Sequence, residues 1–453
     1  GTGAVTINLG SFDLVTFTAP NTFNLAGGTL AATGGTTNLP VTQIGAGSFG
    51  VISGILSGTG SLTVNTPNLL TLSGANTFTG TANVLTAGTL NINNAAALGA
   101  ATAAWSLNGG TIDNTSGAAI TTGANPLTLG GNVTFTGTQS LNLAGTVALA
   151  ANRSLGVLQN TLTLSGVVSG AGALTKNGFG NLTLSAANTY TGGTILNAGV
   201  ATAGNAAAFG AGSITVNGIN GQVSNVFSGG TVGNGSSGMG ATLDLAALTP
   251  TNSIILAGGA LTGSAIDPAK VSGYGFIQGT MTGANALTVN TTGALTLYTA
   301  GTFTGGTTLT AGTLNLMNAG SMGTGAFTWN GGTLDNTTTG WVTPTNAFTL
   351  GGNVTAQGTQ GLTLNGATTI ATARTVTVNA GGIWFGGTVT LTAAINKAGP
   401  GILGLNGVAN TGAGGVNVLA GTLYSDTTVT TAPSFGTGPV AISSGANAII
   451  ISK

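Results

Sequence analysis

A two-residue alternation of aliphatic and small polar side chains runs through most of this chain. Leu127-Thr128-Leu129 and Leu162-Thr163-Leu164 are two of its many copies. In a β-strand, neighbouring side chains point to opposite faces, so each such segment has one apolar and one polar face. Clusters of Gly, Asn and Ser interrupt the alternation every several residues, as turns require. No sustained helical periodicity accompanies the pattern, which therefore predicts an all-β fold.

The chain also repeats itself over a long interval. Asn76-Thr77-Phe78-Thr79-Gly80 returns as Gly301-Thr302-Phe303-Thr304-Gly305. The sparse charges keep the same register, because Lys176 matches Lys397. The sequence therefore predicts two duplicated halves joined by a Gly- and Ser-rich connection. The expected parts are a β-solenoid module at 1–217, the connection at 218–240 and a second module at 241–453.

A finer repeat lies within each half. Gly-Thr-Leu or a close variant starts at Gly88 and Gly110, and again at Gly312 and Gly332. A period of roughly 20–25 residues, combined with two-residue alternation and glycine corners, is typical of a β-solenoid. Each coil would pack its apolar stripe inward and bond its backbone to the coils above and below. Thr, Asn and Ser would then form the outward faces without charged residues.

Composition excludes several functions. Of 453 residues only six are Lys or Arg and six are Asp, and His and Cys are absent. These absences exclude disulfides, thiolate or imidazole metal sites, and Cys or His catalysis. A net charge of zero argues against binding nucleic acid or anionic lipid, which requires clustered cations. A content of 42% hydrophobic residues argues against disorder, and no apolar stretch approaches the ~20 residues of a membrane span.

One segment resembles a known family. Residues 174–194 read Leu-Thr-Lys-Asn-Gly-Phe-Gly-Asn-Leu-Thr-Leu-Ser-Ala-Ala-Asn-Thr-Tyr-Thr-Gly-Gly-Thr. They are similar to the autotransporter-associated β-strand repeat, the passenger-associated repeat of bacterial autotransporters. A weaker copy begins at Lys397, and partial copies surround Phe78 and Phe303. The resemblance implies a right-handed parallel β-helix that is secreted or displayed on a bacterial cell surface.

An enzyme on a solenoid of this kind would need clustered Asp for calcium, or Lys, Arg and carboxylates close together. Asp113 and Asp335 occupy equivalent positions beside Asn114 and Asn336, where polar turn residues are expected. Asp244 and Asp267 lie about one coil apart and form the best remaining pair. The six acids are Asp13, Asp113, Asp244, Asp267, Asp335 and Asp426. Because they are widely separated, we expect no catalytic, cofactor-binding or metal-ligating residue, and no enzyme.

Other candidates carry two interpretations each. Lys176 and Lys397 could bind an acidic ligand, although solvated corner positions are expected. The tryptophans could stack on sugars or pack in the core or at corners; they are Trp105, Trp329, Trp341 and Trp384. Gly-x-Gly-x-x-Gly occurs at 45–50 and 233–238. Turns are expected at both, because no helical pattern follows to form a phosphate cradle.

Irregular Thr-x-Thr segments raise the possibility of ice binding. Thr134-Phe135-Thr136 is one of these segments. Ice-binding solenoids present flat threonine arrays, whereas Thr-x-Thr here lacks a fixed register from coil to coil. Ice binding is therefore not favoured.

The two ends share one repeat phase and carry apolar strand sequences without capping charges. Gly1-Thr2-Gly3-Ala4-Val5 matches Gly436-Thr437-Gly438-Pro439-Val440, and Ala448-Ile449-Ile450-Ile451 follows. Open solenoid ends recruit other strands, and a head-to-tail contact that does not close forms a filament.

Two functions are predicted from these observations. The first is a secreted or surface structural protein that self-assembles through its N- and C-terminal coils. The second is a monomeric autotransporter-type adhesin passenger with an unidentified ligand. Neither involves nucleic acid, a cofactor or membrane insertion of this chain.

Overall fold

A computed structural model describes residues 4–13, 22–31, 39–45, 47–218, 240–407, 410–427, 435–445 and 447–452. These residues form two compact units, one of Gly1–Asp244 with Pro250–Ser253 and one of Leu245–Thr249 with Ile254–Lys453. In the described part the only helices are two three-residue 3-10 turns, η1 (Val41–Gln43) and η2 (Pro268–Lys270). No helix there is long and apolar enough to cross a membrane.

The first unit consists of short strands. In chain order they are β1 (Val5–Asn8), β2 (Ser11–Asp13), β3 (Phe23–Ala31), β4 (Leu39–Pro40), β5 (Phe49–Ile52), β6 (Leu56–Ser57), β7 (Thr63–Leu72), β8 (Asn83–Ile92), β9 (Trp105–Leu107), β10 (Thr111–Asp113), β11 (Ile120–Thr121), β12 (Leu127–Leu129), β13 (Val133–Phe135), β14 (Leu141–Leu143), β15 (Val147–Ala148), β16 (Arg153–Val157), β17 (Thr161–Leu164), β18 (Val168–Ser169), β19 (Leu174–Asn177), β20 (Asn181–Leu184), β21 (Thr194–Leu196), β22 (Val200–Ala203), β23 (Ile214–Asn217) and β24 (Thr242–Asp244).

The second unit has the same character. Its strands are β25 (Ile254–Thr262), β26 (Val271–Ile277), β27 (Leu287–Leu297), β28 (Thr307–Leu316), β29 (Phe327–Trp329), β30 (Thr333–Asp335), β31 (Phe348–Leu350), β32 (Val354–Ala356), β33 (Leu362–Leu364), β34 (Thr368–Ile370), β35 (Arg374–Val378), β36 (Gly382–Phe385), β37 (Val389–Leu391), β38 (Ile395–Ala398), β39 (Ile402–Leu405), β40 (Val416–Val418), β41 (Thr422–Thr427), β42 (Val440–Ile442) and β43 (Asn447–Ser452).

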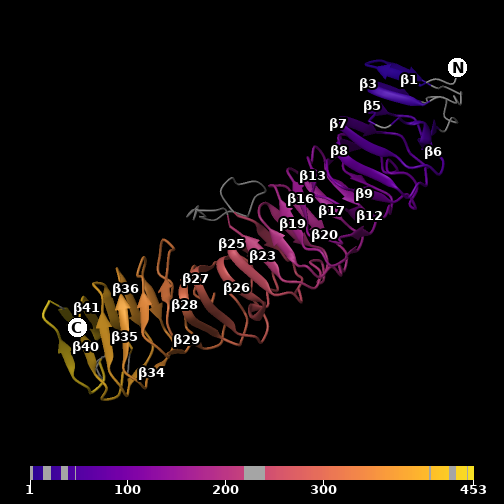
Figure 1. The fold of residues 1–453 in the computed structure, drawn as a ribbon. Helices are drawn as coiled ribbons and strands as arrows, with labels where there is room; N and C mark the ends of the chain where they lie inside the picture. The colour runs from indigo at the N-terminus through magenta and orange to yellow at the C-terminus, as the bar shows by residue number, and fades with distance from the viewer. Residues whose placement is uncertain are drawn as a thin grey trace. The chain divides into compact units, whose positions relative to one another are not determined.

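Parallel pairing between successive turns of the chain builds the first unit. Leu141 lies opposite Leu162, and Leu162 lies opposite Leu182, so partners are about one coil apart in sequence. In the middle of the unit a turn contributes one strand to each of three ladders, as β14, β15 and β16 do before β17, β18 and β19 pair with them. Figure 1 shows β13, β16 and β19 stacked in this order. The unit is therefore a parallel β-solenoid, as predicted.

The core of the first unit is a stack of identical positions. Leu143, Leu164 and Leu184 lie in register on three successive turns, and each is almost fully buried. The intervening threonines and asparagines point outward, which follows from the alternation of side-chain direction along a strand. Burying one leucine contributes about 1.5–3 kcal/mol, so stability accumulates turn by turn.

The second unit is also a parallel three-ladder coil. Its ladders run through β29, β31, β34 and β37, through β30, β32, β35, β38, β40 and β42, and through β33, β36, β39, β41 and β43. Inward positions again alternate with outward ones, as Ile383 and Phe385 are buried on either side of the half-buried Trp384. The expected coil length of 20–25 residues is confirmed here by the pairing of Leu362 with Ile383 and of Ile383 with Leu403.

Inward-facing asparagines hold the corners of the coils. Asn188 accepts a hydrogen bond at Oδ1 from the Val168 amide (2.7 Å) and donates from Nδ2 to the Ala208 carbonyl. Asn76 makes the same pair of contacts in an earlier turn, with Leu56 and Ala97. These amides pair backbone groups that the short strands leave unbonded, and such groups are costly when buried without a partner.

Replacing a core leucine should cost far more than replacing an exposed one. Leu182 is fully buried between coils, whereas Leu158 is 46% exposed. We expect Leu182→Ala to lower the free energy of unfolding by about 2–5 kcal/mol and Leu158→Ala to have little effect. Urea titration followed by tryptophan fluorescence measures both. Equal losses in the two variants would contradict a core stacked at these positions.

Candidate functional site

Two carboxylates that the sequence singled out act as structural clamps. Asp113 is 5% exposed, and its Oδ1 accepts hydrogen bonds from the amides of Asn114 and Thr138, both at 2.9 Å. Its Oδ2 accepts from the Thr138 hydroxyl at 2.6 Å. All of these donors belong to the strand's own end or to the next coil, so the carboxylate links two turns.

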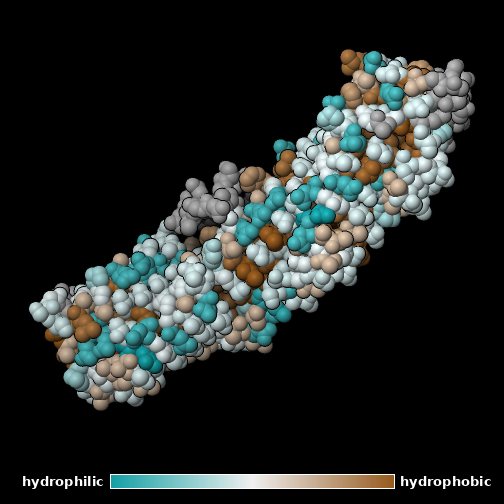
Figure 2. Space-filling model, viewed as in Figure 1, coloured by the Kyte–Doolittle hydropathy of each residue, from teal (hydrophilic) through white to brown (hydrophobic). Residues whose placement is uncertain are grey.

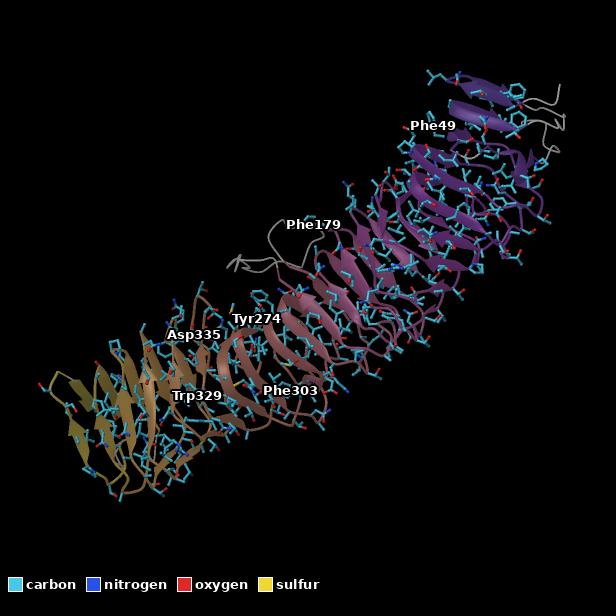
Figure 3. The ribbon with its side chains drawn as sticks, viewed as in Figure 1. Phe49, Phe179, Tyr274, Phe303, Trp329 and Asp335 are labelled. Carbon is cyan, nitrogen blue, oxygen red and sulfur yellow. The ribbon has the colours of Figure 1, made fainter. Side chains whose placement is uncertain are left out.

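Asp335, labelled in Figure 3, repeats this arrangement in the second unit. It accepts from the amides of Asn336 and Thr359 at 2.9 and 3.0 Å, and from the Thr359 hydroxyl at 2.7 Å. Asp113 and Asp335 precede Asn114 and Asn336, and both carboxylates are buried. Their lone pairs are occupied by backbone and hydroxyl donors of the protein itself.

The other acids form no cluster in the described residues. Asp267 begins η2 and accepts from the Ala269 amide at 3.0 Å, and its carboxylate also accepts from the Asn285 side chain. Asp244 ends β24 of the first unit, whereas Asp267 belongs to the second. Asp13 ends β2, and the side chain of Asp426 lies outside the described residues. Among the residues described, no group of three acids could hold a metal ion.

The lysines correct the sequence-based expectation. Solvated corners were predicted for Lys176 and Lys397, but both are 0% exposed. The physical reason lies in the strand phase. Lys176 follows Leu174 by two residues, so its side chain points inward with that leucine. Lys397 stands in the same relation to Ile395.

Backbone carbonyl oxygens accept hydrogen bonds from each buried lysine ammonium group. Lys176 Nζ donates to the oxygens of Gly178 and Ala198 at 2.7 and 2.9 Å, the second of these being one coil further on. Lys397 Nζ has three acceptors at 2.6–3.0 Å, which are the carbonyls of Ala398, Gly399 and Ala420. Burial lowers the pKa of Lys176 to about 7 and the pKa of Lys397 to about 8. The lysines therefore join successive coils.

Two of the four tryptophans belong to the core. Trp105 is 1% exposed, donates from Nε1 to the Leu98 carbonyl at 3.0 Å and packs edge-on to Phe78. Trp329, labelled in Figure 3, is fully buried beside Phe327. For these two residues, the interpretation as core packing is confirmed.

The other two tryptophans form an aromatic pair on the outside of the second unit. Trp341 is 60% exposed and precedes Val342, which bridges to Leu362 of the next coil. Trp384 lies on the outward face of β36, one coil beyond Leu362 and therefore two coils from Trp341. The two ring centroids are 4.5 Å apart, with an angle of 51° between the ring planes. Residues far apart in sequence thus meet on one sheet, β33-β36-β39-β41-β43.

Glycines make room for this pair. A Cβ atom at Gly361 would overlap the Trp341 indole, and a Cβ at Gly382 or Gly404 would overlap the Trp384 indole. Each ring therefore lies over glycine backbone as well as against the other indole. Sequence reasoning named the tryptophans but not these glycines, whose role depends on register between coils.

The pair lies on an uncharged surface. Polar side chains beside it are neutral: Thr343 and Asn365 are exposed and Thr363 is half-buried. No charged residue occurs on the stretches of this sheet at 341–346, 361–366, 382–387 and 402–407. In Figure 2, pale and teal residues prevail on the face of the molecule in view, interrupted by brown apolar patches.

The remaining candidates supply no site. Gly45 to Gly50 leads into β5 and contains a turn in which the Ser48 amide donates to the Gly45 carbonyl at 3.2 Å. The match at 233–238 lies outside the described residues. Thr134 pairs with Thr111, which pairs with Thr89. This threonine row ends after three coils, at Gly156 on one side and at Leu69 on the other.

Comparison with known proteins agrees with the resemblance seen in the sequence. The model of the passenger-associated-transport-repeat family matches residues 69–92, 174–200, 287–316 and 395–424. An adhesin BmaC autotransporter from Brucella suis biovar 1 (strain 1330) is 30% identical over 407 residues, which cover 82% of this chain. The chain spans 10% of the length of that relative. No solved structure matches. The chain thus carries passenger-associated transport repeats.

The buried lysines predict a rise of stability with pH. In the unfolded chain a lysine keeps its proton up to about pH 10.5, whereas the folded lysines lose theirs above about 7 and 8. The unfolded state therefore binds more protons in this window, and stability rises with pH by at most about 1.4 kcal/mol per unit for each lysine. Urea titrations at pH 7 and 9.5 measure the change.

The control is the double variant Lys176→Met and Lys397→Met, which should lose this pH dependence. The variant should also be less stable at pH 7, because the carbonyl acceptors lose their donors. The same pH slope in parent and variant would show that these lysines do not change protonation on unfolding.

Proposed function

We propose that this chain is part of the passenger of an adhesin-type autotransporter, a non-enzymatic scaffold on the bacterial surface or secreted from it. Its task is to present outward-facing side chains to a ligand outside the cell. The observation that carries the proposal is the aromatic pair of Trp341 and Trp384, held outward on a sheet whose inward face is fully occupied by core residues. Aromatic residues, Trp among them, are enriched at binding interfaces relative to the rest of a protein surface.

The comparisons support this proposal over the alternatives. The transport repeats occur in four segments, and the curated relative is called an adhesin. An enzyme is disfavoured because the buried acids Asp113 and Asp335 use their oxygens as clamps between coils. We extend the ligand-binding function of the relative's name to this chain only as a proposal, since the chain spans a tenth of that protein.

We further propose a right-handed coil and an origin by duplication, with modules at 1–217 and 241–453 and a connection at 218–240. Equivalent contacts support the duplication. Lys176 and Lys397 each bind carbonyls of their own corner and of the next coil. Asp113 and Asp335 clamp a threonine of the next coil in the same way.

Adhesion can be tested with the purified chain, residues 1–453, carrying a fluorescent label. We expect saturable binding to cultured mammalian epithelial cells that excess unlabelled chain displaces. Because only 12 residues are charged, binding should change little between 50 and 300 mM salt. A labelled, unrelated β-solenoid of similar size is the control. Binding that does not saturate, or that equals the control, would overturn the proposal.

Head-to-tail assembly remains a separate prediction that the comparisons do not support. The side chains of Ile449, Ile450 and Ile451 lie outside the described residues, as does Lys453. The adhesin proposal expects a monomer in sedimentation velocity at all concentrations. Polymers that grow with concentration and dissolve in the variant Ile7→Asp would instead favour the filament.

A further inference from the structure

We infer that Trp341 and Trp384 form a binding site for pyranose rings of neutral glycans. This inference deepens the proposed adhesin function and rests on it only for the source of the ligand. A pyranose ring has an apolar face of C–H groups, which carry a small positive charge and pack against the negative face of an aromatic ring. Its rim of hydroxyl groups needs hydrogen-bond donors and acceptors beside the aromatic surface. Both requirements are met on the sheet β33-β36-β39.

The glycines hold the indoles along the sheet. Trp384 Cδ1 lies over Gly404 of the next coil, and its Cη2 lies over Gly382 of its own strand. These atoms are at opposite ends of the indole, so the long axis of the ring runs along the sheet surface. Gly361 faces the ring-fusion atoms Cδ2 and Cε2 of Trp341, whose plane is inclined to that of Trp384. An indole supported by backbone in this way keeps aromatic surface available on the side away from the sheet.

The two rings are held close enough to act on one ligand. Centroids 4.5 Å apart and ring planes at 51° place the indoles of Trp341 and Trp384 in direct contact at an open angle. One sugar ring can therefore stack on one indole while the other indole contacts its edge. Because both side chains are already packed in position, little rotamer freedom would be lost on binding.

The neighbouring polar groups match an uncharged ligand. The hydroxyls and amide of Thr343, Thr363 and Asn365 can each donate and accept hydrogen bonds to sugar hydroxyls. Lys397, the charged residue nearest in sequence to β39, is fully buried and occupied by carbonyls. Arg374, the nearest to β36, is half-buried at the start of β35 in another ladder. A sulfated or carboxylated glycan would find no cation on the described stretches of this sheet.

A purely structural role is the competing explanation. Tyr274 also lies over a glycine, Gly293, and is 41% exposed, so an aromatic ring can simply cover glycine backbone. That role concerns stability alone. Paired rings with 60% exposure of Trp341 exceed what covering one glycine requires, and ligand binding distinguishes the two explanations.

The test is calorimetric titration of the purified chain with cellohexaose, mannohexaose and lacto-N-tetraose, and with a heparin hexasaccharide as the charged comparator. We expect one or more neutral glycans to bind and to change the intrinsic tryptophan fluorescence, since Trp105 and Trp329 are buried and should not respond. Trp341→Ala and Trp384→Ala should each weaken binding about tenfold or more. Trp384→Phe, which keeps an aromatic face, should lose less.

Phe179→Ala is the matched control, because Phe179 is also 60% exposed but lies in the first unit (Figure 3). It should leave glycan binding unchanged. Thermal unfolding of every variant separates loss of binding from loss of folding, and Trp341→Ala, at the more exposed ring, should unfold at nearly the parent temperature.

Several outcomes would overturn the inference. These are no binding of any neutral glycan at 5 mM, binding of heparin alone, or glycan binding that both alanine variants retain. Cell binding that persists while every glycan fails would reject this inference and leave the adhesin proposal standing. Cell binding lost in both alanine variants without any glycan binding would assign the pair to a protein ligand. Dimers that Trp341→Ala disrupts would assign it to a second copy of the chain.

Discussion

In-register parallel hydrogen bonding between successive coils is the constraint on which the rest of this structure depends. Each strand satisfies its backbone only if the strand one coil later has the same phase. A position that faces inward in one turn therefore faces inward in the next, as Leu141, Leu162 and Leu182 do. Hydrophobic burial is then shared along the stack, and a chain with 3% charged residues needs no other means to specify a core.

Short strands leave backbone groups at every corner that the ladders cannot pair, and buried polar side chains supply the partners. Asn188 pairs an amide and a carbonyl in neighbouring coils, Lys176 gathers carbonyls and Asp113 gathers amides. The residue type follows from which backbone groups are unpaired, since carbonyl oxygens need a hydrogen-bond donor and amides need an acceptor. Residues that would indicate catalysis or ligand binding in another fold are thus part of the scaffold here.

Outward-facing side chains are free of this requirement for matching from coil to coil, and the proposed binding function lies on that face. Inward positions must match from coil to coil, whereas outward ones can change, provided that the backbone remains paired. Trp384 and the glycines beneath it use that freedom, because Gly382 and Gly404 leave the space that an indole fills. A scaffold of this kind can gain a binding site by substitution at a few outward positions, without repacking the core.

The sequence by itself determined the all-β fold, the parallel coil and its repeat length, because alternation and periodicity are properties of the chain alone. Alternation also determines the direction of most side chains, including that of Lys176, which faces inward by its strand phase although its charge alone favours an exposed position. Only the tertiary structure decided which residues meet. Trp341 and Trp384 are two coils apart, and their contact depends on the register between coils and on bare glycine backbone between them. Register is set by the lengths of turns that carry no periodic pattern. The two tryptophans could therefore be identified as candidates from the sequence, but their contact could not be predicted from it.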